Sequence, residues 1–435
     1  MVKVKRCLCF AVAACLMMGI IGFAAGCNKS DVLLVWAHTQ ELKDIVEEYY
    51  FEAYPEKKEK VKVEVYPDDV FQTKLDGVLS TGINAPDVMI LQIGFIQKYI
   101  EKGSLASLSS DGLGLSAYAE EKCYDYTIDV ATGADGKLYG LAWQAIPGGY
   151  FYRRSVAEEL WGQSDPEFVQ SKLSTWDDFM EVAYELKNHG DKRIMSSLNG
   201  SLDVFVSQRE RPWIENGKME IQSFVTEYFE HCRALQEGRT GDKAPQGLYV
   251  NETSEFTTGW YTDMSNPDIF GFFLPAWGMQ YYLKNYAGDT YGDWGLVRGP
   301  VSWFSGSSML SVYEGSKKKD EAKHLIEYLC LNEEFLETYA RESGEFVNNK
   351  NVVNTIKKDC SEEFLAGQNH YALFDEWAKD VNGDTVGPYD SAIYTLCNDV
   401  SIQDALNAEE YRTLDEAVGV FKALIKNSFP TISVV

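Results

Sequence analysis

The sequence predicts an α/β fold in two lobes, each a mostly parallel sheet flanked by helices. The first observation is length, because 435 residues, even without an N-terminal segment of 27, exceed what one hydrophobic core usually organises. The second is an apolar, β-rich run at residues 32–37 that leads directly into a helical pattern. The third is that strand and helix signals alternate to the C-terminus without a fixed repeat, as in doubly wound sheets.

The first elements are expected in the order strand, helix, strand, helix, strand. Residues 32–37 (VLLVWA) have the composition of a strand buried in a parallel sheet. Apolar residues from Leu42 to Tyr50 then recur at helical spacing, and Pro55 ends that helix. The unit is completed by an alternating strand at 61–66, a helix over about 70–80 and a strand at 87–91. Loops that follow the carboxyl ends of such strands are where ligands bind.

Later signals predict the second lobe and the closing helices. Thr175 precedes a helix with Asp177 and Asp178 in its first turn, and residues 318–331 form a strongly amphipathic helix. Short strands are expected at 138–143, 149–153, 269–274 and 309–313. Four tryptophans fall within helical or surface patterns and are interpreted as structural: Trp161, Trp176, Trp213 and Trp377.

The N-terminus has the pattern of an export signal. Three basic residues among the first six precede an apolar run over residues 7–25. A retained spanning helix is the alternative, but small residues close the run and no stop-transfer charges follow it. The end of the run, Ala24-Ala25-Gly26-Cys27, resembles a bacterial lipoprotein box, although alanine stands where leucine is usual. We therefore expect residues 1–27 to be a signal that ends at a lipidated Cys27, with ordinary secretion as the alternative.

Composition excludes several classes of function. The formal charge of −26 repels phosphate backbones and anionic headgroups, so no nucleic-acid partner is expected. The cysteines after Cys27 are scattered, and none has the Cys/His spacing of a zinc site, so neither a metal nor a cofactor is expected. Most of them should be small core residues, and a single disulfide remains open. These five are Cys123, Cys232, Cys330, Cys360 and Cys397.

Four segments, in this order and spacing, resemble the family 1 extracellular solute-binding proteins, the group that includes maltose-binding protein. They are TGINAPDV at 81–88, GKLYGLAW at 136–143, YRR at 152–154 with STWDDF at 174–179, and the glycine-rich stretch from 292 to 306. Ala142 stands where that family usually has proline. The similarity is closest to the lipoprotein members of the family in Gram-positive bacteria.

The resemblance implies a periplasmic-binding-protein-like fold with a hinge between its lobes, which close on a ligand. The N-terminal lobe is expected to comprise residues 28–140 and about 302–350, and the C-terminal lobe residues 141–301 and about 351–435. It also implies the substrate-binding component of an ABC importer, lipid-anchored on the outer face of the cytoplasmic membrane. A monomer is expected, with membrane permease subunits and a separate ATPase as partners and a carbohydrate, most simply a neutral oligosaccharide, as ligand. A polyol or glycerol phosphate remains an alternative ligand.

A sugar site needs aromatic rings interleaved with short polar groups, because sugars present both hydroxyls and flat C–H faces. The chain has this composition, with ten Trp and 26 Tyr. The candidate ligand-binding residues are Trp36, His38, Gln40, Gln92, Trp143, Gln144, Trp260, Asp263, Trp277, Trp303, Phe304 and Glu345. Each aromatic among them could instead pack in the core, and Trp143 could pack at the hinge. His38 could have an ordinary role in its loop, and Glu345 could cap a helix end.

The competing class is an exported carbohydrate-active enzyme, a glycoside hydrolase or lyase. Hydrolysis needs two carboxylates on opposite faces of the sugar, and 66 acidic residues supply accidental pairs. No Gly-x-Ser-x-Gly, His-Glu-x-x-His or His/Cys constellation is present. We therefore expect no enzymatic activity and assign no catalytic residue.

Overall fold

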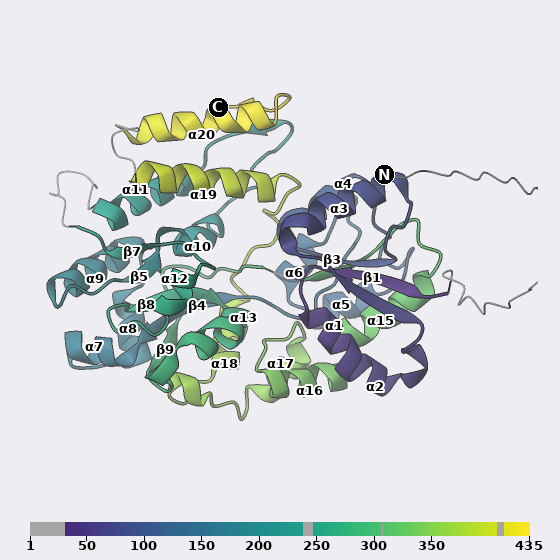
Figure 1. Cartoon of the computed structure of the whole chain (residues 1–435), viewed down its shortest axis with the longest axis horizontal. Coiled ribbons are helices and arrows are strands. Elements are labelled where there is room, and N and C mark those ends of the chain that lie inside the picture. Colours follow the sequence, from purple (N-terminus) through teal and green to yellow (C-terminus); the bar gives the residue numbers. More distant parts are fainter. Residues whose placement is uncertain (1–30, 238–246, 307, 407–412) are drawn as a thin grey trace, which may run out of the picture. The chain divides into compact units, whose positions relative to one another are not determined.

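The computed structural model describes residues 31–237, 247–306, 308–406 and 413–435 (Figure 1). The predicted export signal and the lipidated Cys27 lie outside the described residues. Leu33–Val435 forms one compact unit. Within the described residues, no helix combines the length and the apolar character needed to cross a membrane. The five described cysteines are free thiols.

The first sheet has the strand order β10-β3-β1-β2. Strand β1 is parallel to both β2 and β3, and β10 is added antiparallel at the edge beyond β3. Helices α3 and α4 lie on one side of this sheet, and α1 and α15 lie on the other (Figure 1). These strands and helices are β1 (Leu33–Ala37), α1 (Glu41–Ile45), β2 (Val61–Val65), α3 (Asp68–Thr81), β3 (Val88–Leu91), α4 (Ile93–Glu101), β10 (Met309–Val312) and α15 (Lys319–Leu331). The predicted parallel α/β unit is confirmed here.

The second sheet is built around β4, which runs antiparallel to β8 on one side and to β9 on the other. Because both are antiparallel to β4, strands β8 and β9 run in the same direction, with β4 reversed between them. A bridge between Arg193 and Ile269 leads to the parallel pair β5 and β7. The bounds are β4 (Gly148–Arg153), β5 (Met195–Ser197), β7 (Val250–Thr253), β8 (Gly271–Pro275) and β9 (Trp294–Val297). The expectation of a mostly parallel sheet is therefore right for the first sheet and wrong for the second, whose three strands β8-β4-β9 pair antiparallel.

The strand expected at 138–143 is absent as a continuous element. Leu138 and Leu141 make only isolated bridges, to Thr132 and Leu310 respectively. The apolar alternation is real, since Leu141 and Trp143 are each 1% exposed. The segment is therefore buried without pairing to a neighbouring strand along its length.

Two apolar clusters hold the second sheet in place. One joins the first sheet to one face of the second and includes Trp294 and Phe272. The other packs the remaining face of the second sheet against helices, and there Trp176 stacks on Phe205 with ring centroids 3.9 Å apart. Its helices are α9 (Trp176–Asn188), α11 (Ser223–Glu237), α19 (Asp390–Leu406) and α20 (Leu414–Ser428). The capping of α9 by Thr175 confirms the predicted helix start.

Strand β4 begins in tight contact with the segment that returns to the first sheet. Gly148 donates its N–H to the Trp303 carbonyl at 2.8 Å. A Cβ added at Gly148 would lie 2.2 Å from Cζ2 of the Trp303 indole. Only glycine fits there without displacing that ring.

We predict that Gly148→Ala lowers the free energy of unfolding by about 1–3 kcal/mol, because the methyl group forces Trp303 or β4 to shift. The matched control is Gly77→Ala in α3, where an added Cβ meets nothing within 4 Å. That helical replacement should raise stability by about 0.5–1 kcal/mol. Urea unfolding of both variants tests this, and equal midpoints for Gly148→Ala and wild type would contradict it.

Candidate functional site

A cavity of about 890 Å³ is lined by residues from both sheets. The first sheet contributes the loop after β1, from His38 to Glu41, together with Gln92 after β3. The second sheet contributes the end of β8 and the helical turn that follows it, α13 (Ala276–Gly278). These positions follow the carboxyl ends of β1, β3 and β8, where side chains from separate strands meet.

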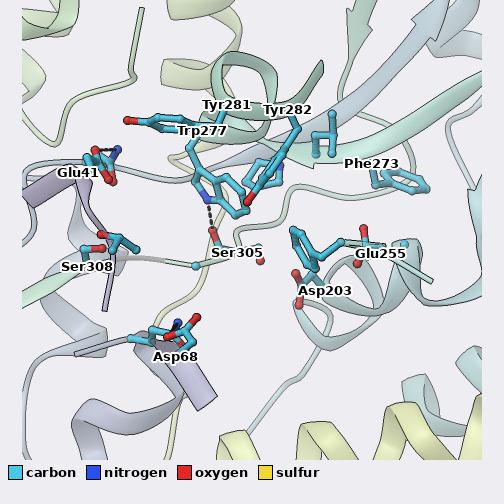
Figure 2. A pocket seen from close by; sticks show the side chains of 18 of the residues that line it. Glu41, Asp68, Asp203, Glu255, Phe273, Trp277, Tyr281, Tyr282, Ser305 and Ser308 are labelled. Carbon is cyan, nitrogen blue, oxygen red and sulfur yellow. Dashed lines mark hydrogen bonds between the residues drawn. The ribbon is translucent and has the colours of Figure 1, made fainter. Parts of the chain in front are cut away.

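Aromatic rings form one wall of the cavity. Trp277 follows Pro275, which ends β8, and its Nε1 donates a hydrogen bond to the Ser305 carbonyl at 3.0 Å (Figure 2). The Tyr282 ring packs edge-on against Trp277, with centroids 5.6 Å apart. Gly306, at φ +85°, approaches the same indole so closely that an added Cβ would lie 3.0 Å from Nε1. The wall also includes Phe256, Trp260, Tyr261, Phe273, Tyr281, Trp303 and Tyr394.

Carboxylates stand across from these rings. Glu41 lies on one side of the view, and Asp203 and Glu255 lie on the other (Figure 2). Burial and then the Asp203 charge raise the pKa of Glu255 well above its usual 4.5. Burial also raises the pKa of Asp203, although the Ser305 and Tyr394 hydroxyls donate to it. A carboxyl held this way accepts or donates hydrogen bonds but tolerates a nearby negative charge poorly.

The described cavity wall contains four carboxyl groups and neither lysine nor arginine. The fourth carboxyl, Asp68, lies 3.1 Å from Nδ1 of His38, and this close imidazole lowers the pKa of Asp68. Without a fixed cation on this wall, a bound phosphate or carboxylate would add to the negative charge instead of neutralising it. The arrangement suits a neutral or cationic ligand rich in hydroxyl groups.

A second carboxyl pair lies at the first-sheet end of the cavity. Gln144 Nε2 donates to Glu41 at 2.8 Å and to Glu345 at 3.1 Å. Glu41 also accepts from the Tyr339 hydroxyl at 2.7 Å and from Trp143 Nε1 at 3.3 Å. Burial raises the pKa of Glu41, and burial followed by the Glu41 charge raises that of Glu345 well above 4.5. One amide thus bridges two desolvated carboxyl groups.

Several buried polar atoms on the cavity wall have no hydrogen-bond partner among the described residues. They include Trp303 Nε1, Thr39 Oγ1 and His38 Nε2. Buried polar groups in folded proteins are almost always paired, with protein, water or a ligand. These three groups belong to side chains that line the cavity, and the atoms themselves are buried beneath its surface.

Seven of the twelve predicted residues line the cavity: His38, Gln40, Gln92, Gln144, Trp260, Trp277 and Trp303. The structure does not bring the other five to this wall. Trp36 is held in β1, where its Nε1 donates to Glu64 and its ring packs on Tyr66.

The remaining four residues make other contacts. Trp143 is buried and donates to Glu41, and Glu345 lies behind Gln144. Asp263 accepts hydrogen bonds from Ser196 and Asn251. Phe304 faces a neighbouring, smaller cavity.

Sequence reasoning missed the carboxylates and the tyrosines of the wall. Glu41, Asp68, Asp203 and Glu255 carry no motif that separates them from the other acidic residues of the chain. Tyr281 and Tyr282 could have been found, because they continue the helical turn that begins at Trp277. The lining residues with polar groups or rings that are not among the twelve candidates are Thr39, Glu41, Asp68, Asp203, Glu255, Phe256, Tyr261, Phe273, Tyr281, Tyr282, Ser305, Ser308 and Tyr394.

A cavity lined at the strand ends of two helix-flanked sheets is the arrangement expected of a two-lobed ligand-binding protein. Residues 50–364 match the profile of the family described as "Bacterial extracellular solute-binding protein". The chain belongs to this family, which confirms the resemblance found in the sequence. The family consists of solute-binding proteins and not of enzymes, so the reading as a carbohydrate-active enzyme is not supported.

A curated relative with similar sequence is the arabinooligosaccharide-binding protein of Halalkalibacterium halodurans. It is 22% identical over 270 residues, which are 58% of this chain and 55% of that protein. The match thus spans about half the length of the relative.

Solved structures show the same fold. One is the ABC transporter associated binding protein of B. animalis subsp. lactis Bl-04 in complex with β-1,6-galactobiose, with a TM-score of 0.70 and 22% identity over 93% of this chain and 99% of that one. Another is the sugar-binding protein MalE of Xanthomonas citri, with a TM-score of 0.69 and 16% identity over 90% of this chain and 95% of that one. The predicted two-lobed α/β fold is confirmed by these similarities.

The Glu345 carboxyl makes the stability depend on pH. Its pKa is raised in the folded protein, so its stabilising contribution is complete below pH 4.5 and is lost as the pH rises through the folded-state value. We predict that Glu345→Gln, whose amide stays neutral and still accepts from Gln144, gains stability relative to wild type as the pH rises above 4.5. Urea midpoints measured between acidic and neutral pH test this.

The matched control is Glu121→Gln, since Glu121 is exposed at the end of α5 (Ser116–Lys122). It should follow the wild-type profile. A Glu345→Gln profile that also runs parallel to wild type would show that this carboxyl is not protonated preferentially in the folded state.

Proposed function

We propose that this protein is the substrate-binding component of an ABC importer and holds a neutral oligosaccharide in the cavity. The observation that carries the proposal is the composition of the wall, in which aromatic rings alternate with carboxyl and amide groups. Rings such as Trp277 and Tyr282 suit the C–H faces of sugars, and groups such as Asp203 and Gln144 suit hydroxyls. An anionic ligand, including glycerol phosphate, fits poorly because the described wall offers it no lysine or arginine.

The size of the cavity supports an oligosaccharide over a single sugar. Its volume of about 890 Å³ lies near the upper end of the range of about 300–1,000 Å³ typical of small-molecule sites. The names of the relatives point the same way, since one is an arabinooligosaccharide-binding protein and another was solved with a disaccharide.

The twelve candidate residues enter this proposal in two groups. The seven on the wall are proposed to contact the sugar directly. Trp143 and Glu345 are proposed to position Glu41 and Gln144 through the hydrogen bonds described above. Trp36, Asp263 and Phe304 have no proposed contact with a ligand in this cavity.

Capture by lobe closure is part of the same proposal. The proposal keeps the lobe boundaries near residues 140, 301 and 350 and places the hinge in the segments that run between the two sheets. Two of these segments pair with each other through a bridge between Gln144 and Val347, and another bridge joins Pro147 to Phe304. A few such connecting residues can absorb the rotation between lobes. Closure would bring the walls contributed by the two sheets together around the ligand.

Delivery to the membrane requires partners on other chains. We propose that the monomer is anchored through a diacylated Cys27 and delivers its sugar to permease subunits driven by a separate ATPase. Two or more acyl chains give stable membrane attachment, whereas a single chain gives marginal attachment.

The proposal predicts stabilisation by neutral oligosaccharides without turnover. Purified protein is incubated with maltose, β-1,6-galactobiose, arabinobiose and digalacturonate, and both the melting temperature and the products are recorded. A bound sugar at a hundredfold excess over its Kd adds about 2.7 kcal/mol of stability. At least one neutral sugar should raise Tm, whereas digalacturonate should not, because its carboxylates meet Asp203 and Glu255. Released product, or a response to the acidic sugar alone, would overturn the proposal.

A further inference from the structure

A second cavity of about 210 Å³ adjoins the main one. The two cavities share Gln92, Asp203, Ser305, Gly306 and Tyr394 in their walls. Beyond these shared residues, the second cavity is lined by the start of α4, the residues from Val206 to Trp213, Phe304 and the first turns of α19. The shared residues therefore form a neck between two compartments.

The walls of the second compartment carry both polar and apolar groups. Arg209 Nη1 donates to Asp390 at 2.7 Å, and the two side chains are only 4% and 11% exposed. The Arg209 guanidinium lies 5.5 Å from the centre of the Trp213 ring. Asp390 also accepts from the Gly387 N–H at 2.9 Å, so this buried pair is held in one geometry.

One donor in this compartment lacks a partner. Trp213 is 3% exposed, and its Nε1 has no hydrogen-bond partner among the described residues. A buried indole N–H normally finds an acceptor. Trp213 and Phe304 both line the compartment, and their rings are of the kind that packs on the C–H face of a sugar unit.

The volume decides how much of a ligand the compartment holds. About 210 Å³ is below the range of about 300–1,000 Å³ that accommodates whole ligands, so the compartment suits one part of a molecule whose remainder lies in the main cavity. The neck is polar, with the Asp203 carboxyl and the Tyr394 hydroxyl hydrogen-bonded to each other. A chain of linked sugar rings can exchange such hydrogen bonds as it passes.

We propose that the second compartment is a subsite for the terminal unit of a longer neutral oligosaccharide that threads past Asp203. This inference rests on the proposed function, because it assigns the chain length that the same site selects. A competing exit for a longer ligand runs along Tyr261 and Tyr286, whose rings stack with centroids 4.6 Å apart and of which Tyr286 is 45% exposed. The buried Arg209–Asp390 ion pair on its wall and the five residues that it shares with the main cavity favour the compartment over that exposed pair.

The test fills the compartment from its exposed side. Thr395 lines it from the surface of α19, so Thr395→Phe should occupy the space without disturbing the core. Ala392→Phe is the matched control, because Ala392 is exposed on the same helix and lines neither cavity. Calorimetry measures the affinity of each variant for the dimer and the tetramer of the malto, β-1,6-galacto and arabino series. Melting temperatures verify that both variants fold.

The wild-type protein should bind the tetramer more tightly than the dimer in the series that it recognises. Thr395→Phe should reduce tetramer affinity about tenfold while changing dimer affinity less than twofold, and Ala392→Phe should change neither. Equal effects on both lengths, or none on either, would overturn the second compartment and leave the proposed function standing. If Tyr286→Ala, and not Thr395→Phe, abolished the tighter binding of the tetramer, the additional sugar units would lie along Tyr261 and Tyr286 and not in the second compartment. Binding of no oligosaccharide by wild type would overturn the proposed function and this inference together.

Discussion

The hydrogen bond from Trp277 Nε1 to the Ser305 carbonyl is the constraint on which the cavity depends. It orients the indole just beyond the end of β8, and it ties that strand to the segment returning to β10. Gly306 allows the close approach, because its positive φ and missing side chain leave room for the ring. Tyr282 packs on the edge of this indole and also contacts the rings of Phe256, Trp260 and Tyr261, so it links Trp277 to the rest of the aromatic wall. A preorganised wall loses little conformational entropy when a ligand stacks on it.

The charge pattern narrows what such a wall can hold. Acidic groups at both ends of the cavity, Glu41 with Glu345 and Asp203 with Glu255, are desolvated enough that their pKa values rise. Hydroxyl groups satisfy such carboxyls without adding charge, whether the carboxyl is protonated or not. The acidity of the whole chain, with its formal charge of −26, thus continues on the cavity wall, where the described residues include four carboxyl groups and neither lysine nor arginine. The aromatic rings and the uncharged or weakly acidic carboxyl groups of the wall therefore suit the same kind of ligand, a neutral one.

Much of the fold could be predicted from the sequence, and the site only in part. The first sheet could be predicted because its strands are short apolar runs, and the segment between the first two has apolar residues at helical spacing. The direction of β4 was not, because antiparallel and parallel buried strands have the same composition. Trp277 could be found because a strand-ending proline precedes it and a glycine follows it. Trp36 could not be assigned to a face, since four of the five residues of β1 are buried. The carboxylates of the wall could not be predicted, because the residues that surround each of them are distant from it in the sequence.

The most direct measurement is calorimetric titration of Trp277→Ala and Trp277→Phe with the neutral oligosaccharide that stabilises the wild-type protein most. Loss of the ring should weaken binding about tenfold or more, as expected when a buried aromatic contact worth about 1.4 kcal/mol or more is removed. The phenylalanine variant keeps a stacking face and loses only the N–H, so it should retain more affinity than the alanine variant. Unchanged affinity in a correctly folded Trp277→Ala protein would contradict the account, because the sugar would then bind without the wall around which the cavity is arranged.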